Sequence, residues 1–145
     1  MVDAGNKVIQ SFIEKMPHAE ALGLKILQLG AGEAEMLMPW SEDLIGDPET
    51  GVIHGGAVST LMDTCSGAAV ICHPENGGVT ATLDLRIDYM RPASPGQDVR
   101  AHAECYNITR SIAFVRATAF DDDASRPVAT ATGAFTIAFR KEASA

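Results

Sequence analysis

The cysteine and histidine patterns that would indicate a disulfide framework or a metal centre are missing from this chain of 145 residues. The three cysteines, Cys65, Cys72 and Cys105, are an odd number without a CxxC spacing, so neither a disulfide framework nor a zinc site is indicated. We expect them to be small buried thiols. The four histidines form no HxH or HExxH pattern, which argues against a catalytic metal.

Long apolar runs are also missing. No stretch reaches the roughly 20 apolar residues that a membrane-spanning helix needs, and the first residues lack the basic-then-apolar order of a secretory signal. We therefore expect a cytoplasmic protein with no membrane partner. The chain contains no repeat, low-complexity tract or linker, which predicts one domain over residues 1–145.

Positive charge is scarce in the first part of the chain. The net charge is −8, which argues against a nucleic-acid partner. Residues 1–85 contain three lysines and twelve acidic residues, whereas all seven arginines follow in residues 86–145. An anionic ligand would have to use this second part, although solvated strand edges and turns explain most of these arginines and are the favoured explanation for any single one.

Hydrophobic periodicity predicts a helix, two strands, a second helix and four further strands. The first helix is capped by Asp3 and ends at Pro17, two short strands follow within residues 22–40, and residues 41–53 are a turn-rich acidic loop. Residues 55–72 form a helix that is apolar over most of its circumference, as expected of a buried central helix. The four later strands lie at residues 80–91, 98–107, 111–120 and 127–139.

This order of elements predicts an α+β fold. A long antiparallel sheet must cover its apolar face, and only the helix at residues 55–72 is hydrophobic enough to fill it. We expect a curved sheet wrapped around this helix. A free sheet edge and a small core favour a dimer.

Asp63 lies inside this apolar helix, where we expect it to be largely inaccessible to water. An unpaired buried carboxylate is costly, so Asp63 needs either polar partners or a chemical role. A structural carboxylate bonded to a neighbouring side chain, or to a partner chain, remains an alternative.

Gly55 and Gly56 begin the same helix, where unbonded amide N–H groups and the helix dipole favour negative charge. Without side chains, this turn lets a ligand carbonyl approach the amides, as in an oxyanion hole worth about 3 to 4 kcal/mol of barrier. Together with Asp63 as general base or nucleophile, it indicates hydrolysis of an activated acyl group.

Gly55 and Asp63 are nevertheless about 12 Å apart along a helix, too far to act on one carbonyl carbon. Two antiparallel helices across a twofold axis would bring the amide of one chain to the acid of the other. We therefore expect a composite site at a dimer interface.

The segment "VIHGGAVSTLMDTCSGAAV", followed by "TATLDLRIDYMRPA", resembles the hot-dog-fold acyl-CoA thioesterases of the phenylacetic-acid-degradation (PaaI-like) group. The resemblance covers residues 20–138. It implies a helix wrapped by a sheet, dimers that often pair into homotetramers, and hydrolysis of acyl-CoA. It implies no metal and no cofactor beyond the CoA of the substrate.

By position, the resemblance makes Asp63 the catalytic acid and Gly55 the amide donor to the thioester carbonyl, with Gly56 beside it. Thr82 lies where related enzymes often have a hydroxyl that helps to place water, although a plain strand threonine explains it equally well. His54 is interpreted chiefly as a brace for the loop, with direct proton transfer as the alternative.

The resemblance is incomplete at residue 48. Related enzymes often carry an asparagine where this chain has Pro48, and Asp47, Glu49 or Thr50 would have to replace it. The phosphates of CoA should meet an arginine, and Arg91 and Arg110 are the candidates. The candidates for an apolar acyl pocket, which core packing explains equally well, are Phe12, Ile13, Leu37 and Met62.

Three functions follow from these residues. The first is an acyl-CoA thioesterase acting on aryl or medium-chain substrates. The second is a non-catalytic acyl-CoA-binding or regulatory protein, which the departure at Pro48 favours. The third is a hydratase or dehydratase, which normally adds a histidine shortly after its acid; residues 64–72 contain none.

Overall fold

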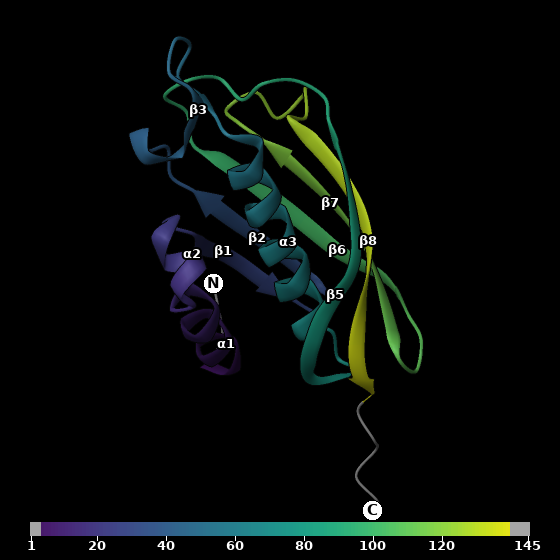
Figure 1. Ribbon diagram of the computed structural model, residues 1–145. Helices are drawn as coiled ribbons and strands as arrows, with labels where there is room; N and C mark the ends of the chain where they lie inside the picture. The colour runs from purple at the N-terminus through teal and green to yellow at the C-terminus, as the bar shows by residue number, and fades with distance from the viewer. Residues whose placement is uncertain (1–3, 140–145) are drawn as a thin grey trace, which may run out of the picture.

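A curved antiparallel sheet wraps around one long helix, α3 (Figure 1). The computed structural model describes residues 4–139. Its helical elements are α1 (Ala4–Glu14), α2 (Pro17–Ala21), the 3₁₀ turn η1 (Glu42–Leu44) and α3 (Gly55–Ile71). Its strands are β1 (Lys25–Gly30), β2 (Glu33–Met38), β3 (Ile45–Asp47), β4 (Val52–Ile53), β5 (Asn76–Tyr89), β6 (Val99–Ile108), β7 (Ile112–Phe120) and β8 (Ala129–Phe139).

Six strands form the main sheet in the order β1-β2-β6-β7-β8-β5, and β3 pairs with β4 in a separate hairpin. All these pairings are antiparallel. The α+β fold, the two strands before the central helix and the four after it are confirmed. Strand β5 lies at an edge of the sheet, where one side of its backbone has no neighbouring strand among the described residues.

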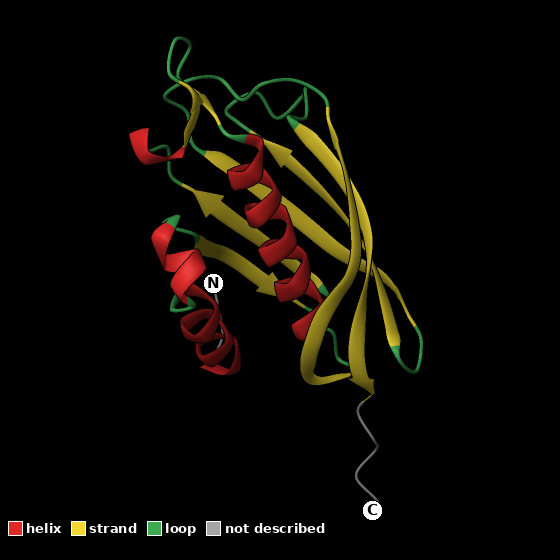
Figure 2. Cartoon of the chain, in the orientation of Figure 1, coloured by secondary structure: helices red, strands yellow, loops and turns green. Residues whose placement is uncertain are grey.

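Helix α3 supplies the centre of the core because it is apolar on most sides. Leu61, Met62 and Cys65 are completely buried, and the helix packs against β2, β5, β6 and β7. Helices α1 and α2 cover the part of the sheet nearest β1 (Figure 2). Among residues 4–139, no helix is long and apolar enough to cross a membrane.

Two local predictions are wrong. Pro17 does not follow the last turn of a single helix; it begins α2, because a proline lacks the N–H that the first turn of a helix leaves unbonded. Residues 41–53 are not a plain loop: they form η1, capped by the Ser41 side chain, and the β3–β4 hairpin. The predicted cap Asp3 lies outside the described residues.

A bulge in β5 depends on Gly133 of β8. The pairing register between these strands shifts between Thr82 and Asp84. A Cβ atom on Gly133 would lie 2.5 Å from the Asp84 carbonyl oxygen, closer than real Cβ contacts allow, and a tight 3.2 Å from Leu85 Cα. The absent side chain therefore permits the close approach of the bulged strand.

A buried ion pair joins the segment after β5 to the segment after β7. The Asp121 carboxylate is completely buried, and both of its oxygens accept hydrogen bonds of 2.7 Å from the Arg91 guanidinium. The Ser94 and Asp123 backbone N–H groups also donate to this carboxylate. The bonds from Arg91 hold the pKa of Asp121 well below its usual range.

We predict that Gly133→Ala destabilises the protein by about 1–3 kcal/mol, because the added methyl group has to displace backbone atoms of β5. Gly30→Ala is the matched control, since its Cβ would meet only Glu33 Cβ at 3.9 Å. Urea unfolding of both variants measures the effect, and equal stability of the two would contradict the proposed close approach.

We predict that Asp121→Asn costs about 3 kcal/mol at pH 7, because it leaves the Arg91 guanidinium without its counter-ion. Because folding lowers the pKa of Asp121, the stabilisation is present above the unfolded pKa of about 4 and declines as the pH falls below it. The difference between wild type and variant should therefore narrow in urea unfolding at progressively lower pH. The exposed pair of Asp123 and Arg126 provides a control, and Asp123→Asn should have a much smaller effect.

Candidate active site

His54 caps the beginning of α3. Its Nδ1 atom accepts a hydrogen bond of 2.8 Å from the Gly56 N–H, and its carbonyl oxygen accepts bonds from the Ala57 and Val58 N–H groups. The His54 side chain thus holds the turn, as its bracing role predicts. A Cβ on Gly56 would lie 2.9 Å from His54 Nδ1, so this cap requires glycine at residue 56.

The cap leaves one amide of the glycine turn without a partner. Among the described residues, no acceptor bonds the Gly55 N–H, and Gly55 is exposed. The expectation that Gly56 also offers its amide to a ligand is wrong, because that N–H is bonded to the imidazole. The sole unbonded donor of this pair is therefore Gly55 N–H, the group expected to face a carbonyl oxygen.

Asp63 and Thr82 come together across α3 and β5. The Thr82 hydroxyl donates a hydrogen bond of 2.8 Å to Asp63 Oδ1. Asp63 is only partly buried, so the expectation of an inaccessible carboxylate is wrong for a single chain. It faces Leu85 and Ile87 of the edge strand across an open cavity of about 530 Å³, which water can enter.

Gly55 and Asp63 do not meet within one chain. Both lie on the continuous helix α3, and eight residues of helix separate them by about 12 Å. One chain therefore cannot bring both groups to the same carbonyl carbon, which is the reason for expecting a composite site. The pairing of two chains remains a prediction.

Two polar contacts in this region involve residues to which the sequence assigned no role. The Tyr89 hydroxyl donates to the Gly55 carbonyl oxygen at 3.0 Å. His18 Nε2 lies 3.3 Å from Thr60 Oγ1, and the Thr60 hydroxyl donates to the Gly56 carbonyl oxygen. Since that hydroxyl has one proton, the imidazole N–H must be the donor to Thr60. Only the "YMRPA" ending pointed towards Tyr89, and no local pattern pointed to His18.

A second cavity, of about 310 Å³, opens beside the glycine turn. Apolar side chains form much of its wall: Leu22 just after α2, Leu44 and Ile45 of the η1–β3 segment, and Ala57 of α3. The expected acyl-pocket residues lie elsewhere. Ile13 and Met62 are buried in the core, and Phe12 is exposed on α1 in a different hollow. Leu37 is a partly buried residue of β2 that lines neither cavity.

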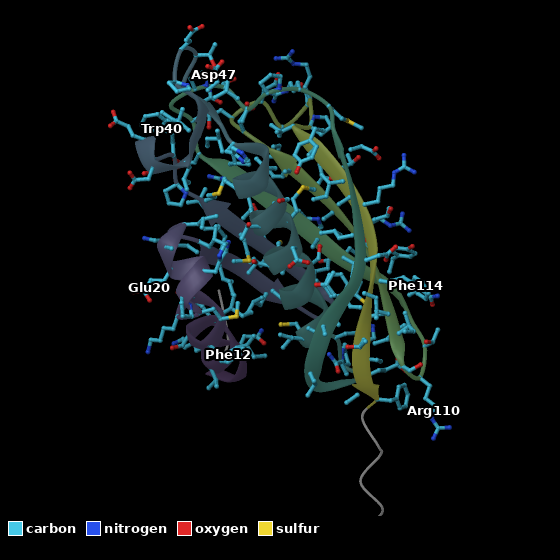
Figure 3. All side chains as sticks on the ribbon, in the orientation of Figure 1. Phe12, Glu20, Trp40, Asp47, Arg110 and Phe114 are labelled. Atoms are coloured by element: carbon cyan, nitrogen blue, oxygen red, sulfur yellow. The ribbon has the colours of Figure 1, made fainter. Side chains whose placement is uncertain are left out.

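Asp47 closes the β3–β4 turn. Its carboxylate accepts hydrogen bonds from the Thr50 hydroxyl at 2.7 Å and the Glu49 N–H at 3.0 Å, and these bonds lower the pKa of Asp47. Figure 3 shows Asp47 at the outer tip of the molecule, and Glu49 is likewise exposed. Their roles beside Pro48 in substrate binding remain predictions.

The two candidate arginines differ in their surroundings. All five N–H groups of the Arg91 guanidinium are used, by both Asp121 oxygens and by the carbonyl oxygens of Pro92 and Arg126. The expectation that Arg91 binds a phosphate of CoA is therefore wrong, because its donors stabilise the fold. Arg110 is exposed in the β6–β7 turn, at the end of the sheet opposite Asp47 (Figure 3). Its role remains a prediction.

The three cysteines form no disulfide. Cys65 and Cys105 are buried, as expected, and Cys72 is partly buried. Burial raises the pKa of the Cys65 and Cys105 thiols. Within residues 4–139, no group of three or more histidine, cysteine or acidic side chains is placed to hold a metal ion.

Comparison with known proteins connects this geometry to a family. The family model of the thioesterase superfamily matches residues 50–128, which include α3 and most of the later strands. Human acyl-coenzyme A thioesterase 13 is 27% identical over 114 residues, covering 79% of this chain and 80% of the human protein. A Halobacterium salinarum protein is 35% identical over 95 residues, which span 63% of this chain and 62% of that protein.

Solved structures agree in fold. A Pseudomonas aeruginosa protein is 41% identical with a TM-score of 0.80, and the match covers 90% of this chain and 96% of that one. An Asn-to-Asp variant of the phenylacetic acid degradation protein PaaI from Thermus thermophilus is 33% identical with a TM-score of 0.73. That match covers 83% of this chain and 98% of PaaI. The chain therefore belongs to the thioesterase superfamily, shares its hot-dog fold and has PaaI among its relatives.

Proposed function

We propose that this protein hydrolyses acyl-CoA thioesters to free acid and CoA, at a centre shared by two copies of the chain. The observation that carries the proposal is the Gly55 N–H, the one amide of the capped glycine turn left to meet a ligand. The relatives named acyl-CoA thioesterases support a thioester as the substrate and CoA as its carrier.

In this reaction, the thioester carbonyl oxygen accepts a hydrogen bond from Gly55 N–H, which stabilises the negative charge that develops there. Asp63 of the other copy removes a proton from water as the water oxygen attacks the carbonyl carbon. The tetrahedral intermediate then breaks its carbon–sulfur bond, and the CoA thiolate leaves and takes up a proton. Direct attack by the Asp63 carboxylate is the alternative first step.

The hydrogen bond between Thr82 and Asp63 supports this role. It occupies one carboxylate oxygen and fixes the side chain, while the other oxygen has no hydrogen-bond partner among the described residues and lies beside an open cavity. A fixed carboxylate with one oxygen towards water is the arrangement that a general base needs.

The free edge of β5 supports the pairing of two chains. Large apolar side chains are exposed along and just after this strand: Val79, Leu83, Tyr89 and Met90. An unpaired edge with apolar side chains is an unusual surface for a monomer. Pairing two β5 edges would bury it and bring two α3 helices side by side in opposite directions. Pairing of such dimers into a tetramer is an extension of this proposal.

The cavity beside the glycine turn is suited to the acyl group. Its apolar wall adjoins Gly56 and His54, so an acyl chain whose carbonyl meets Gly55 N–H would extend into it. Its volume of about 310 Å³ is at the lower end of the range for small-molecule sites and favours aryl or medium-chain groups.

A non-catalytic acyl-CoA-binding protein is the second candidate. Pro48 offers no side-chain amide where related enzymes often have asparagine, and the neighbouring Asp47 carboxylate is engaged within its own turn. This observation concerns only the placement of water, and it leaves the Gly55 donor and the Asp63–Thr82 pair in place.

We predict that Asp63→Asn lowers kcat for acyl-CoA hydrolysis about 100-fold or more, because an amide cannot act as base or nucleophile. Release of CoA thiol from phenylacetyl-CoA and octanoyl-CoA measures the rate. Asp122→Asn, in an exposed loop, is the control and should behave as wild type. Binding of these substrates by the wild type without thiol release would support the second candidate.

We predict that two inactive variants restore activity when mixed as subunits. Gly55→Pro removes the donor N–H, and proline is well tolerated at the first position of a helix. After reassociation of equal amounts of Gly55→Pro and Asp63→Asn chains, half of the dimers are mixed and each has one intact centre, so about a quarter of wild-type activity should return. Mixtures that stay as inactive as the separate variants would place both groups in one chain.

A further inference from the structure

The peptide group between Gly55 and Gly56 is held at both of its polar ends. The Tyr89 hydroxyl donates to its carbonyl oxygen at 3.0 Å, and its N–H donates to His54 Nδ1 at 2.8 Å. Because a peptide group is planar and its C=O and N–H point in opposite directions, bonds to both of these groups fix its rotation about the chain.

The preceding peptide group, between His54 and Gly55, is held at one end. Its carbonyl oxygen accepts bonds from the Ala57 and Val58 N–H groups, and its N–H is the unbonded Gly55 donor. The donor therefore belongs to a peptide group that is held at its carbonyl end and is followed by one that is held at both ends. Two consecutive glycines have more backbone freedom than any other residue pair. On a mobile turn, the N–H bond of the donor would have no fixed direction.

Tyr89 makes this contact from the end of β5. Its ring also lies against Gly55: a Cβ atom on the glycine would be 3.5 Å from ring atom Cε1. In the single chain Tyr89 is 53% exposed, so packing in the core of its own chain does not account for its position. The same strand carries Thr82, whose hydroxyl bonds Asp63, and it runs antiparallel to α3 so that Tyr89 reaches the start of the helix.

We propose that Tyr89 is a positioning residue, whose hydroxyl holds the Gly55–Gly56 peptide so that the Gly55 N–H points at the substrate carbonyl. The proposal rests on the hydrolysis described above. Under this proposal β5 positions both reacting groups of a chain, because Tyr89 orients the Gly55 amide and Thr82 orients the Asp63 carboxylate. An oxyanion donor is effective when it is oriented before the reaction begins, and a donor that must reorient gives up part of that effect.

The test removes only the hydroxyl. Tyr89→Phe keeps the ring against Gly55 and should lower kcat about tenfold and raise KM severalfold, with a melting temperature close to wild type. Tyr106→Phe is the matched control, because it removes the only other tyrosine hydroxyl of the chain. Tyr106 lies on the outer sheet face, with its ring under the Arg116 guanidinium. It should leave kcat unchanged.

A binding measurement separates positioning from a structural role. A CoA analogue in which a methylene replaces the thioester sulfur keeps the carbonyl oxygen, whereas a thioether analogue lacks it. Tyr89→Phe should weaken binding of the ketone analogue severalfold and leave the thioether unaffected. Equal affinity of wild type and variant for the ketone, or a wild-type kcat, would overturn the proposal.

The two proposals fail in different ways. If the wild type hydrolyses acyl-CoA and Asp63→Asn does not, a fully active Tyr89→Phe overturns the role of Tyr89 alone. If the wild type releases no thiol, the proposed function fails, and the ketone and thioether affinities still decide whether Tyr89 orients the donor.

Discussion

Burial of α3 is the constraint on which the rest of this structure depends. The helix is apolar on nearly every side, so the sheet has to curve around it and the chain has to supply six strands to do so. The side of α3 that carries Asp63 stays partly exposed, and the cavity beside it is bordered by Leu85 and Ile87 of β5. Burial of the apolar sides of α3 thus also determines where a carboxylate on this helix can remain partly exposed.

The site at the start of α3 depends on which of the first backbone N–H groups of the helix have hydrogen-bond partners. Helices begin with N–H groups that have no partner within the helix, and side chains usually satisfy them. Here the His54 imidazole satisfies Gly56, and the His54 carbonyl satisfies the next two residues. Glycine is needed at residue 56, where a side chain would collide with the histidine that caps it, whereas a Cβ atom at residue 55 would make only ordinary contact with the Tyr89 ring.

The sequence predicted the features that depend on periodicity or on a short contiguous motif. The buried helix, the strands of the main sheet and the membership of a thioesterase family are confirmed, because each is encoded within a single stretch of chain. Thr82 was correctly placed in the region of Asp63, but a plain strand threonine explained it as well until the hydrogen bond was seen. The role predicted for Arg91 was wrong because its partner Asp121 lies 30 residues later, and local charge does not reveal which acid folds back onto an arginine. The contact of Tyr89 with Gly55 spans 34 residues and was missed for the same reason.

Part of the wall of the cavity beside the glycine turn comes from α2, from Leu22 just after it and from residues 43–45, which contribute no strand to the six-stranded sheet. Their sequences are therefore released from the register and twist that constrain β5 to β8. In the function proposed above, residues that contact the acyl group can therefore diverge while the frame holding Gly55, Asp63 and Thr82 stays intact. Such a division lets one scaffold acquire new selectivities by exchange of a short segment, and it marks residues 43–45 as the segment to redesign for a different acyl group.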